Sequence, residues 1–549
     1  MRQFTLLIFL TGMFGLTGAT CHAGVSMGAA SADASAAFRQ QTVDINGRRA
    51  ILAAYNAGPL PTVSPNGIRL LDGGKNESNA AIFDREPGGL YRHVAASWTM
   101  SIRTGGEGAS FVLLNTQRFG LRGALANAVP WDDPRVQDSF AVAFDVHDPP
   151  TSDPFNTDRN IDGQPEREVA LYWDGNEIVR KLSPVEFRTG TPHGIDVLVD
   201  FVCGGANVTV QIDKMEIFGQ YFIPGMSPYE SRAAFGGQTS NAATTLEISD
   251  IDISYFEQTK PAPPPIVVTA IDGQLLDLGH NSQSNIANFP SDISKFGRII
   301  CTLTLAEPPG GYDPWDRKAA IYAYDDNGER FELLRFITPY HRGYTWNVDV
   351  SDYRPLLVGK RKIEAWCVTY GNGWKVSAAF SFYPGKPDRI AYRVINVWSG
   401  EPEIGNPGKP VSAFFEPRQI VRDANADFVK LRYIVTGHGQ APNTGDAAEF
   451  LPLMRTTSVN GHHYSNLLWT TDNYMNPCRP QGGTWKYDRA GWGPGNVVTP
   501  WDIDVTHDMP RGKPSLIEYT PAAYVNESLS NGNPPVHWTE SQLIFYRRR

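Results

Sequence analysis

The sequence lacks an excess of positive charge and, beyond its N-terminus, any long apolar run. Of 549 residues, 49 are Lys or Arg and 58 are Asp or Glu, so the formal net charge is -9. Proteins that bind nucleic acid neutralise phosphates with clustered basic side chains, and this balance argues against that class. No stretch after residue 23 approaches the ~20 apolar residues that span a bilayer. We therefore expect neither nucleic acid nor a membrane as a partner.

Cysteine and histidine are also sparse, which limits the kinds of metal site that the chain could form. The five cysteines include no Cys-x-x-Cys spacing, so a structural zinc site has little support. The eleven histidines are scattered, and His462 and His463 would point to opposite faces of a strand, which argues against a copper site. No Gly-x-Ser-x-Gly elbow is present for a serine hydrolase. We expect a reaction that needs no metal or other cofactor.

The apolar segment at the N-terminus is typical of a secretory signal peptide. An apolar core over 4–16 follows a positive start, and Cys21 and Ala23 are small residues placed for cleavage after Ala23. A lipid anchor on Cys21 is the alternative, although the preceding residues fit a lipidation box badly. We expect residues 1–23 to be removed and 24–40 to form a flexible leader. The mature protein is expected to be a soluble monomer, secreted or periplasmic.

Turn-forming and aromatic residues are what the chain has in abundance. There are 52 Gly and 41 Pro, with 13 Trp, 22 Tyr and 27 Phe. Aromatic side chains favour strands, and Gly and Pro favour the turns that join strands. Short runs such as 96–102, 139–145 and 298–305 fit this composition, and no stretch shows sustained helical periodicity. The sequence predicts an all-β protein.

Proline-rich breaks divide the chain into three expected domains. The run over 259–265 cannot pair in a sheet and is interpreted as a linker. A second break falls at 384–387. We therefore expect a β-sandwich accessory domain over 41–258 and two further β domains over 266–384 and 388–549.

Short strings of charged and aromatic residues mark the C-terminal half. They are Trp315-Asp316-Arg317, the RFITPY run over 335–340, Ala448-Glu449-Phe450 and the DRAGWGPG loop over 488–495. Taken singly, each has an ordinary explanation, because a carboxylate beside an arginine is usually a surface pair and a Trp between glycines can merely anchor a loop. The order and spacing of the whole set carry more information.

Together, the strings resemble the bacterial peptide-N-glycosidase F family, amidases that release N-glycans from asparagine. The resemblance runs over about 298–549. It implies two eight-stranded antiparallel jelly-roll sandwiches packed side by side, with the cleft for the chitobiose core of the glycan between them. It also implies that Asp316 is the main catalytic residue, and that Glu449, Arg317, Arg489 and Trp492 belong to the site.

The chemistry is reasonable for hydrolysing the side-chain amide of a glycosylated Asn. The reaction needs an activated water, a stabilised oxyanion and a protonated leaving glycosylamine. Asp316 can polarise or deprotonate water, and Arg317 or Arg489 can stabilise negative charge. Glu449 either assists the leaving nitrogen or binds sugar hydroxyls. Trp315, Trp492 and Phe450 offer faces to sugar rings. We expect a peptide-N4-(N-acetyl-β-glucosaminyl)asparagine amidase that converts Asn to Asp on N-linked glycoproteins or glycopeptides.

Two other classes fit part of the pattern. An endo-acting glycoside hydrolase also uses two carboxylates, but it would leave a sugar on the Asn. A non-catalytic glycan-binding protein is the second alternative, because a second Glu of the family is absent from the strand around Cys367. Glu364 lies in that strand and could replace it only if the register shifts.

Other positions also depart from the family pattern. The aromatic residue after the catalytic Glu is Phe450 instead of Trp, and a Trp in the preceding loop is His438. The Cys of the DRAGW loop is Gly493, which leaves Cys478 without its expected partner. These changes bear on sugar stacking and disulfides more than on the reaction itself.

Four cysteines remain after signal cleavage, and they allow three complete pairings. An oxidising compartment favours disulfides. Cys301 and Cys367 both lie in strand-like runs of one domain, so we favour that pair. Cys203 and Cys478 lie far apart in sequence.

The missing Glu also affects the expected pH dependence. A nearby negative charge raises the pKa of a carboxylic acid and a nearby cation lowers it. With Arg317 beside it and one Glu fewer, Asp316 is expected to ionise at lower pH. We therefore expect activity in acid.

The N-terminal domain carries looser signals. The runs 142–148 and 246–255 resemble a concanavalin-type lectin sandwich. Asp158, Asn160 and Asp162 alternate in a pattern that can hold calcium, although no Glu follows at the twelfth position. The alternative is a polar turn between strands. We expect an accessory domain that binds glycan or shapes access to the cleft.

Overall fold

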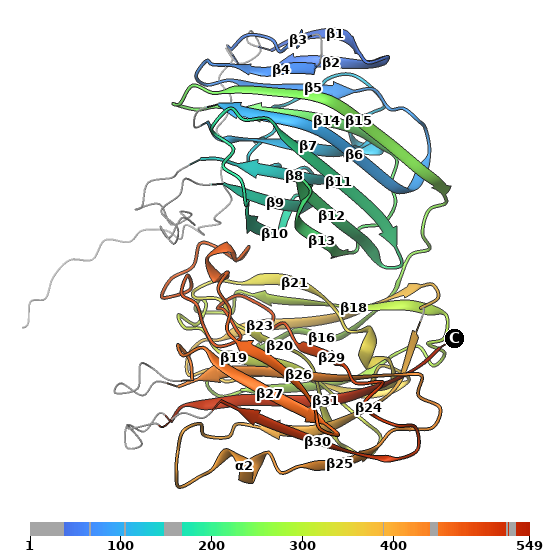
Figure 1. The fold of residues 1–549 in the computed structure, drawn as a ribbon, viewed down its shortest axis with the longest axis vertical. Helices are drawn as coiled ribbons and strands as arrows, with labels where there is room; N and C mark the ends of the chain where they lie inside the picture. Colours follow the sequence, from blue (N-terminus) through green and yellow to red (C-terminus); the bar gives the residue numbers. More distant parts are fainter. Residues whose placement is uncertain are drawn as a thin grey trace, which may run out of the picture.

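The computed structural model consists almost entirely of antiparallel β-strands, arranged in three sandwiches along the chain (Figure 1). It describes residues 38–548 except 57, 65–66, 104–105, 148–166, 388, 440–447, 523–524 and 526–533. No helix in this part of the chain is long and apolar enough to cross a membrane. The predicted all-β class is confirmed.

The N-terminal sandwich has two sheets that share one core. The first has eight strands, in the order β1-β2-β5-β14-β7-β8-β9-β10, and the second has seven, in the order β13-β12-β11-β6-β15-β4-β3. Side chains alternate between the two faces of a strand, and in β11 the inward residues Ile195, Val197 and Val199 belong to the same core as Trp98 of β6, which is the cross-strand partner of Ile195.

The elements of this sandwich are β1 Arg39–Ile45, β2 Arg48–Ala54, β3 Thr62–Ser64, β4 Gly67–Asp72, β5 Ser78–Phe83, β6 Leu90–Arg103, β7 Gly108–Asn115, α1 Thr116–Phe119, β8 Phe140–Asp145, β9 Glu168–Trp173, β10 Asn176–Leu182, β11 His193–Val202, β12 Gly205–Ile212, β13 Met215–Pro224, β14 Ser231–Gln238 and β15 Thr245–Thr259.

The first jelly roll contains two four-stranded sheets, in the orders β16-β23-β18-β21 and β17-β22-β19-β20. In β23, Trp374, Val376 and Phe380 alternate with less buried residues and fill the core between the sheets. The elements are β16 Ile266–Leu276, β17 Ser282–Asn288, β18 Phe296–Ala306, β19 Lys318–Tyr324, β20 Arg330–Ile337, β21 Tyr344–Asp349, η2 Ser351–Leu356, β22 Lys360–Cys367 and β23 Trp374–Pro384.

The second jelly roll has the same construction, with sheets in the orders β24-β31-β26-β29 and β25-β30-β27-β28. Its elements are β24 Arg389–Gly400, α2 Val411–Phe414, β25 Arg418–Val421, β26 Phe428–His438, β27 Leu453–Val459, β28 His462–Leu468, η4 Asn473–Met475, β29 Trp501–Asp504, β30 Pro514–Pro521 and β31 Val536–Arg548. The expected pair of eight-stranded antiparallel sandwiches is confirmed.

The two jelly rolls pack side by side through polar as well as apolar contacts. The buried Arg335 of β20 donates hydrogen bonds to Thr436 of β26 (3.1 Å) and to the carbonyl of Trp538 in β31 (2.5 Å). Tyr353 of η2 donates to Gln542 of β31 (2.8 Å). Both faces of β31 are therefore covered, which explains its almost continuous run of buried residues.

The expected Cys301–Cys367 disulfide is not formed. All four cysteines in the described part of the chain are free thiols. Cys301 lies on β18 and Cys367 on β22, which belong to the two opposite sheets of the first jelly roll. The two strands are therefore not neighbours in a sheet, and the two cysteines do not face each other as a cross-strand pair. Both thiols instead pack in the apolar core.

Some expectations fall outside the described residues or at their edge. The signal peptide over 1–23 and the calcium candidates Asp158, Asn160 and Asp162 lie outside them. β1 begins at Arg39, so the end of the expected leader is a strand. Residues 260–265 lie between β15 and β16 and belong to neither strand.

Candidate active site

A cleft of about 600 Å³ opens between the two jelly rolls, and the strings singled out in the sequence meet there. Six lining residues come from the first jelly roll: Trp315, Asp316, Arg317, Lys318, Ile337 and Tyr340. Six come from the second: His438, Glu449, Phe450, Thr484, Tyr487 and Trp492. All predicted site residues of the C-terminal half except Arg489 line this cleft.

Asp316 is held in place by a buried carboxylate that the sequence analysis missed. Asp313 is fully buried and accepts hydrogen bonds from the backbone of Trp315 (2.9 Å) and the hydroxyl of Thr369 (2.5 Å). The guanidinium of Arg317 donates to both of its oxygens, at 3.2 and 3.1 Å. The chain on both sides of Asp316 is therefore pinned to Asp313. Two nitrogens of the Arg317 guanidinium are used in this ion pair, and Arg317 also lines the cleft.

The surroundings of the Asp316 carboxyl act on its pKa in opposite directions. Burial raises the pKa above its ordinary value. The positive charge of Arg489 and a hydrogen bond from Tyr340 lower it, and burial outweighs them. Burial and the charge of Asp316 in turn raise the pKa of Tyr340 to about 12, which keeps this phenol protonated as a donor. The low pKa expected for Asp316 from the sequence is thus opposed by desolvation.

Arg489 lies directly behind the cleft and connects the two predicted carboxylates. Its side chain is fully buried and donates to the carbonyls of Thr484 (2.8 Å) and Tyr487 (3.0 Å). Its Nε lies 3.5 Å from Oε1 of Glu449, and its charge acts on Asp316 as well. The two carboxylates come from different jelly rolls, and the positive charge of Arg489 acts on both of them.

The backbone before Glu449 needs a glycine opposite it. Ala448 has φ of +73°, which is uncommon for a residue with a side chain. Its carbonyl oxygen lies so close to Gly437 of β26 that a Cβ there would meet it at 1.8 Å. Ala490 donates its backbone N–H to the carbonyl of Glu449 (2.9 Å). These contacts fix the direction in which Glu449 enters the cleft.

Aromatic side chains form the rest of the wall. Trp492 is buried, donates its Nε1 to the carbonyl of Gly437 (2.7 Å) and stacks on His438 with ring centroids 5.0 Å apart. Burial lowers the pKa of His438 well below its ordinary value, so the ring is neutral. Trp315 is 58 % exposed and stands at the rim. Phe450 lies over Arg489, 5.1 Å from its guanidinium carbon.

One candidate from the sequence lies outside the cleft, and two tyrosines that line the cleft were not predicted. Glu364 is buried away from the cleft, where it accepts hydrogen bonds from Ser282 and Tyr324, both at 2.5 Å. It therefore does not replace the missing second Glu. Tyr340 and Tyr487 line the cleft but were not predicted as site residues. Tyr340 ends the RFITPY string, so its position was a signal that could have identified it.

Among the residues that the structure describes, no group of three or more His, Cys, Asp or Glu side chains could hold a metal ion. The groups that line or adjoin the cleft include carboxylates, guanidinium groups, phenols and aromatic rings.

The C-terminal half of the chain is similar in sequence to known proteins. The family model described as "Peptide-N-glycosidase F, C terminal" matches residues 412–539, within the second jelly roll. A curated relative from Elizabethkingia miricola, peptide-N(4)-(N-acetyl-β-D-glucosaminyl)asparagine amidase F, is 28 % identical over 262 residues, which are 45 % of this chain and 73 % of that protein. The resemblance found in the sequence is confirmed.

Two solved structures are also similar to this chain, one over most of its length and the other over about a third of it. The structure of PNGF-II covers 83 % of this chain and 98 % of its own, with a TM-score of 0.43 and 14 % identity. The exoplasmic/lumenal domain of VIP36, solved in a form bound to Ca²⁺ and Man3GlcNAc, covers 36 % of this chain and 83 % of its own, with a TM-score of 0.27 and 10 % identity.

Proposed function

Because the C-terminal half of this chain is related to the peptide-N-glycosidase F family, we propose that the protein hydrolyses the amide between an N-glycan and its asparagine. The observation that carries the proposal is the meeting of Asp316 and Glu449, from two different jelly rolls, at the buried Arg489. The substrate would be an N-linked glycopeptide or glycoprotein. The products would be the glycosylamine and a peptide in which Asn has become Asp.

Asp316 is the residue suited to activating water. Its carboxylate lines the cleft, and its raised pKa makes it a stronger base than an ordinary aspartate. In this role it takes a proton from a water whose oxygen attacks the side-chain carbonyl carbon of the glycosylated Asn. Tyr340 keeps the carboxylate oriented through its hydrogen bond. The C–N bond then breaks, and the leaving nitrogen takes up a proton.

Arg489 and Glu449 are suited to the charges that change during this step. A buried guanidinium favours negative charge near it, because the dielectric screening there is weak. Glu449 lies at the same wall, 15 % exposed at its side chain, and can reach hydroxyls or the leaving nitrogen of a bound glycan. Phe450 and the exposed Trp315 and Tyr487 give flat apolar faces against which sugar rings can stack.

The decisive experiment is mass analysis of a peptide after incubation with the protein in heavy-oxygen water. An amidase converts glycosylated Asn to Asp carrying the labelled oxygen. Recovery of Asn that still bears one sugar would establish an endo-acting glycoside hydrolase instead. Unchanged glycopeptide that is nevertheless retained by the protein would indicate a glycan-binding protein without catalysis.

The proposal includes export of the protein. It is supported by the apolar core over 4–16 and the small residues that precede the predicted cleavage after Ala23. Sequencing the N-terminus of the protein recovered outside the cytoplasm of its host tests this. A recovered chain that starts at Met1 would contradict it.

A further inference from the structure

A second and larger cleft, of about 1390 Å³, lies between the N-terminal sandwich and the C-terminal half. It is separate from the catalytic cleft and shares only the buried Trp492 with it as a wall. Figure 1 shows the two bodies that enclose it, the N-terminal sandwich above and the two jelly rolls below. Small-molecule sites usually occupy about 300–1000 Å³, so this space suits an extended ligand.

All six sheets of the described chain present one of their edges to this cleft. One edge strand from each sheet contributes to its lining: β10 and β13 of the N-terminal sandwich, β20 and β21 of the first jelly roll, and β28 and β29 of the second. Edge strands carry backbone N–H and C=O groups that lack a neighbouring strand. A ligand in this space therefore meets both donors and acceptors.

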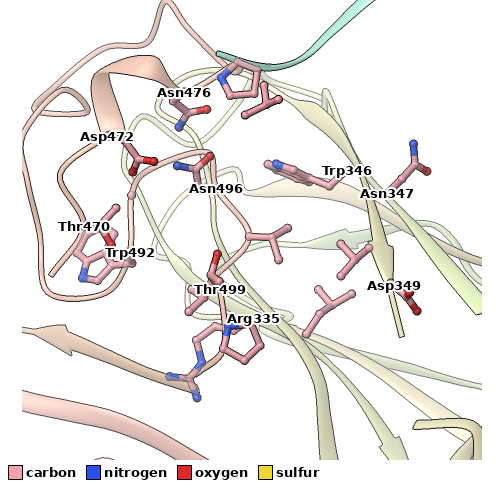
Figure 2. Close-up of a pocket in the computed structure, with 18 of the residues that line it drawn as sticks. Arg335, Trp346, Asn347, Asp349, Thr470, Asp472, Asn476, Trp492, Asn496 and Thr499 are labelled. Carbon is pink, nitrogen blue, oxygen red and sulfur yellow. The ribbon is translucent and has the colours of Figure 1, made fainter. Parts of the chain in front are cut away.

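The side chains labelled in Figure 2 include the tryptophans Trp346 and Trp492 and the asparagines Asn347, Asn476 and Asn496. Trp346 of β21 lies on one side, and Asp472 and Asn496 lie on the other, on segments of the second jelly roll. Trp469 belongs to the same wall. Within the described residues, the side chains of Asp472 and Asn496 make no hydrogen bond or ion pair, and both are accessible to solvent. They are thus free to bind a ligand.

Most other charged side chains in the lining are already neutralised. Glu177 pairs with Arg180 and Arg479. Asp349 pairs with Arg298 at 3.2 Å, and Asp502 pairs with Arg432 at 2.7 Å. A site whose charges are compensated has few unpaired cations to bind a phosphate or a strongly acidic peptide.

We propose that this cleft binds a neutral oligosaccharide. Half-buried tryptophan rings match the apolar faces of sugar rings, and amide and carboxylate side chains match hydroxyls, which both donate and accept hydrogen bonds. Trp346 is held with its Nε1 bonded to the carbonyl of Gly495 (3.1 Å), so it is a preorganised platform. The site does not require the proposed amidase activity, because it lies on the other side of Trp492 from Asp316.

The test is calorimetric titration of the full-length protein with three free pentasaccharides, built from mannose, N-acetylglucosamine and galactose. None of them contains an asparagine amide. We expect at least one to bind, and the double variant Asp472→Ala with Asn496→Ala to weaken this binding by about tenfold or more. These two side chains have no partner in the described structure, so the melting temperature should not change. Trp315→Ala, at the rim of the catalytic cleft, is the matched control and should leave this binding unchanged.

Three outcomes would overturn the proposal. The first is that none of the three sugars binds. The second is that the double variant binds as well as the wild type, or that only Trp315→Ala weakens binding, which would place the sugar in the catalytic cleft. The third is that an extended unglycosylated peptide binds instead and the double variant abolishes it, which would assign the cleft to a polypeptide. Loss of sugar binding with intact amide hydrolysis, or the reverse, separates this proposal from the proposed function.

Discussion

Arg479 of the second jelly roll forms a buried, bidentate ion pair with Glu177 of the N-terminal sandwich. Its two terminal nitrogens lie 2.6 and 3.1 Å from the two carboxylate oxygens, and the side chains are 9 % and 5 % exposed. Burial alone would raise the pKa of Glu177, but the guanidinium groups of Arg180 and Arg479 hold it below its ordinary value. The pair is therefore charged and ties two domains together.

The same loop reaches the catalytic cleft. Gln481, two residues after Arg479, accepts a hydrogen bond from the backbone of Tyr340 (3.2 Å). Arg342 donates to the carbonyl of Pro480 (2.9 Å). Since Tyr340 orients Asp316, the ion pair to Glu177 lies at one end of a short series of contacts that leads to the candidate catalytic carboxylate.

We predict that Glu177→Gln lowers both stability and activity. Removing one partner of a buried pair leaves an uncompensated charge, which typically costs about 3–5 kcal/mol. Thermal unfolding and kcat/KM on one glycopeptide measure the two effects. Glu257→Gln is the matched control, because Glu257 is 59 % exposed in its pair with Arg92 and such pairs contribute about 0–1 kcal/mol. Equal behaviour of the two variants would contradict the prediction.

A fragment over 266–549 is expected to fold without the N-terminal sandwich but to lose activity. The apolar cores of the two jelly rolls contain no residue before 266, so we expect their folding not to depend on the first 258 residues. The fragment nevertheless loses Glu177 as the partner of Arg479 and Phe222 as the ring 3.7 Å from Arg298. Circular dichroism and a glycopeptide assay test both parts. An insoluble fragment would show that the sandwich is needed for folding, and a fully active one that the ion pair does not support the cleft.

Asp316→Asn is expected to reduce turnover by more than about 10²-fold, the scale of a positioned acid–base group. The change keeps the shape of the side chain, so the melting temperature should stay close to that of the wild type. Asp326→Asn, at a side chain that is 81 % exposed, controls for the loss of one negative charge. Near-normal turnover in a stable Asp316→Asn protein would remove Asp316 from the mechanism.

The pH dependence offers a test of how Tyr340 acts. Its hydrogen bond lowers the pKa of Asp316, while burial raises it. Tyr340→Phe removes only the hydroxyl, so the pKa of Asp316 should rise further. If the carboxylate is the active form, activity is lost as pH falls through that pKa, and the acidic limb of kcat/KM should move to higher pH. A limb that stays in place while kcat/KM drops would mean that Tyr340 serves binding rather than ionisation.

The same experiment bears on the expectation of activity in acid. That expectation considered only charges, with Arg317 beside Asp316 and one Glu fewer. In the structure Arg317 is bound to Asp313 through its Nε and one terminal nitrogen, and the cation that acts most on Asp316 is Arg489. Desolvation raises the pKa of Asp316 beyond what these cations offset. The acidic limb of the wild type is therefore expected above the pH at which an ordinary aspartate ionises.

Much of the architecture is visible in the sequence because the signals for it are local. Alternation of apolar and polar residues, as in β23, concerns neighbours along the chain, and a strand needs nothing else to choose its inward face. The strings around Asp316, Glu449 and Trp492 are likewise contiguous, so the family resemblance that implies the cleft can be recognised before any fold is known. Composition and alternation determined the all-β class. The resemblance carried by the strings implied the two jelly rolls and six of the twelve residues that line the cleft.

Only the tertiary structure decided which distant residues touch. Nothing near Arg489 in sequence indicates that it lies between two carboxylates from different sandwiches, or that Arg317 is bound by Asp313. Cys301 and Cys367 lie in one core as free thiols, and nothing in their local sequences indicates that their strands belong to opposite sheets. The same holds for Arg479 and Glu177, 302 residues apart. Such contacts depend on sheet order and domain packing. These bring together side chains that are distant in sequence, and the residues around each side chain do not indicate its partner.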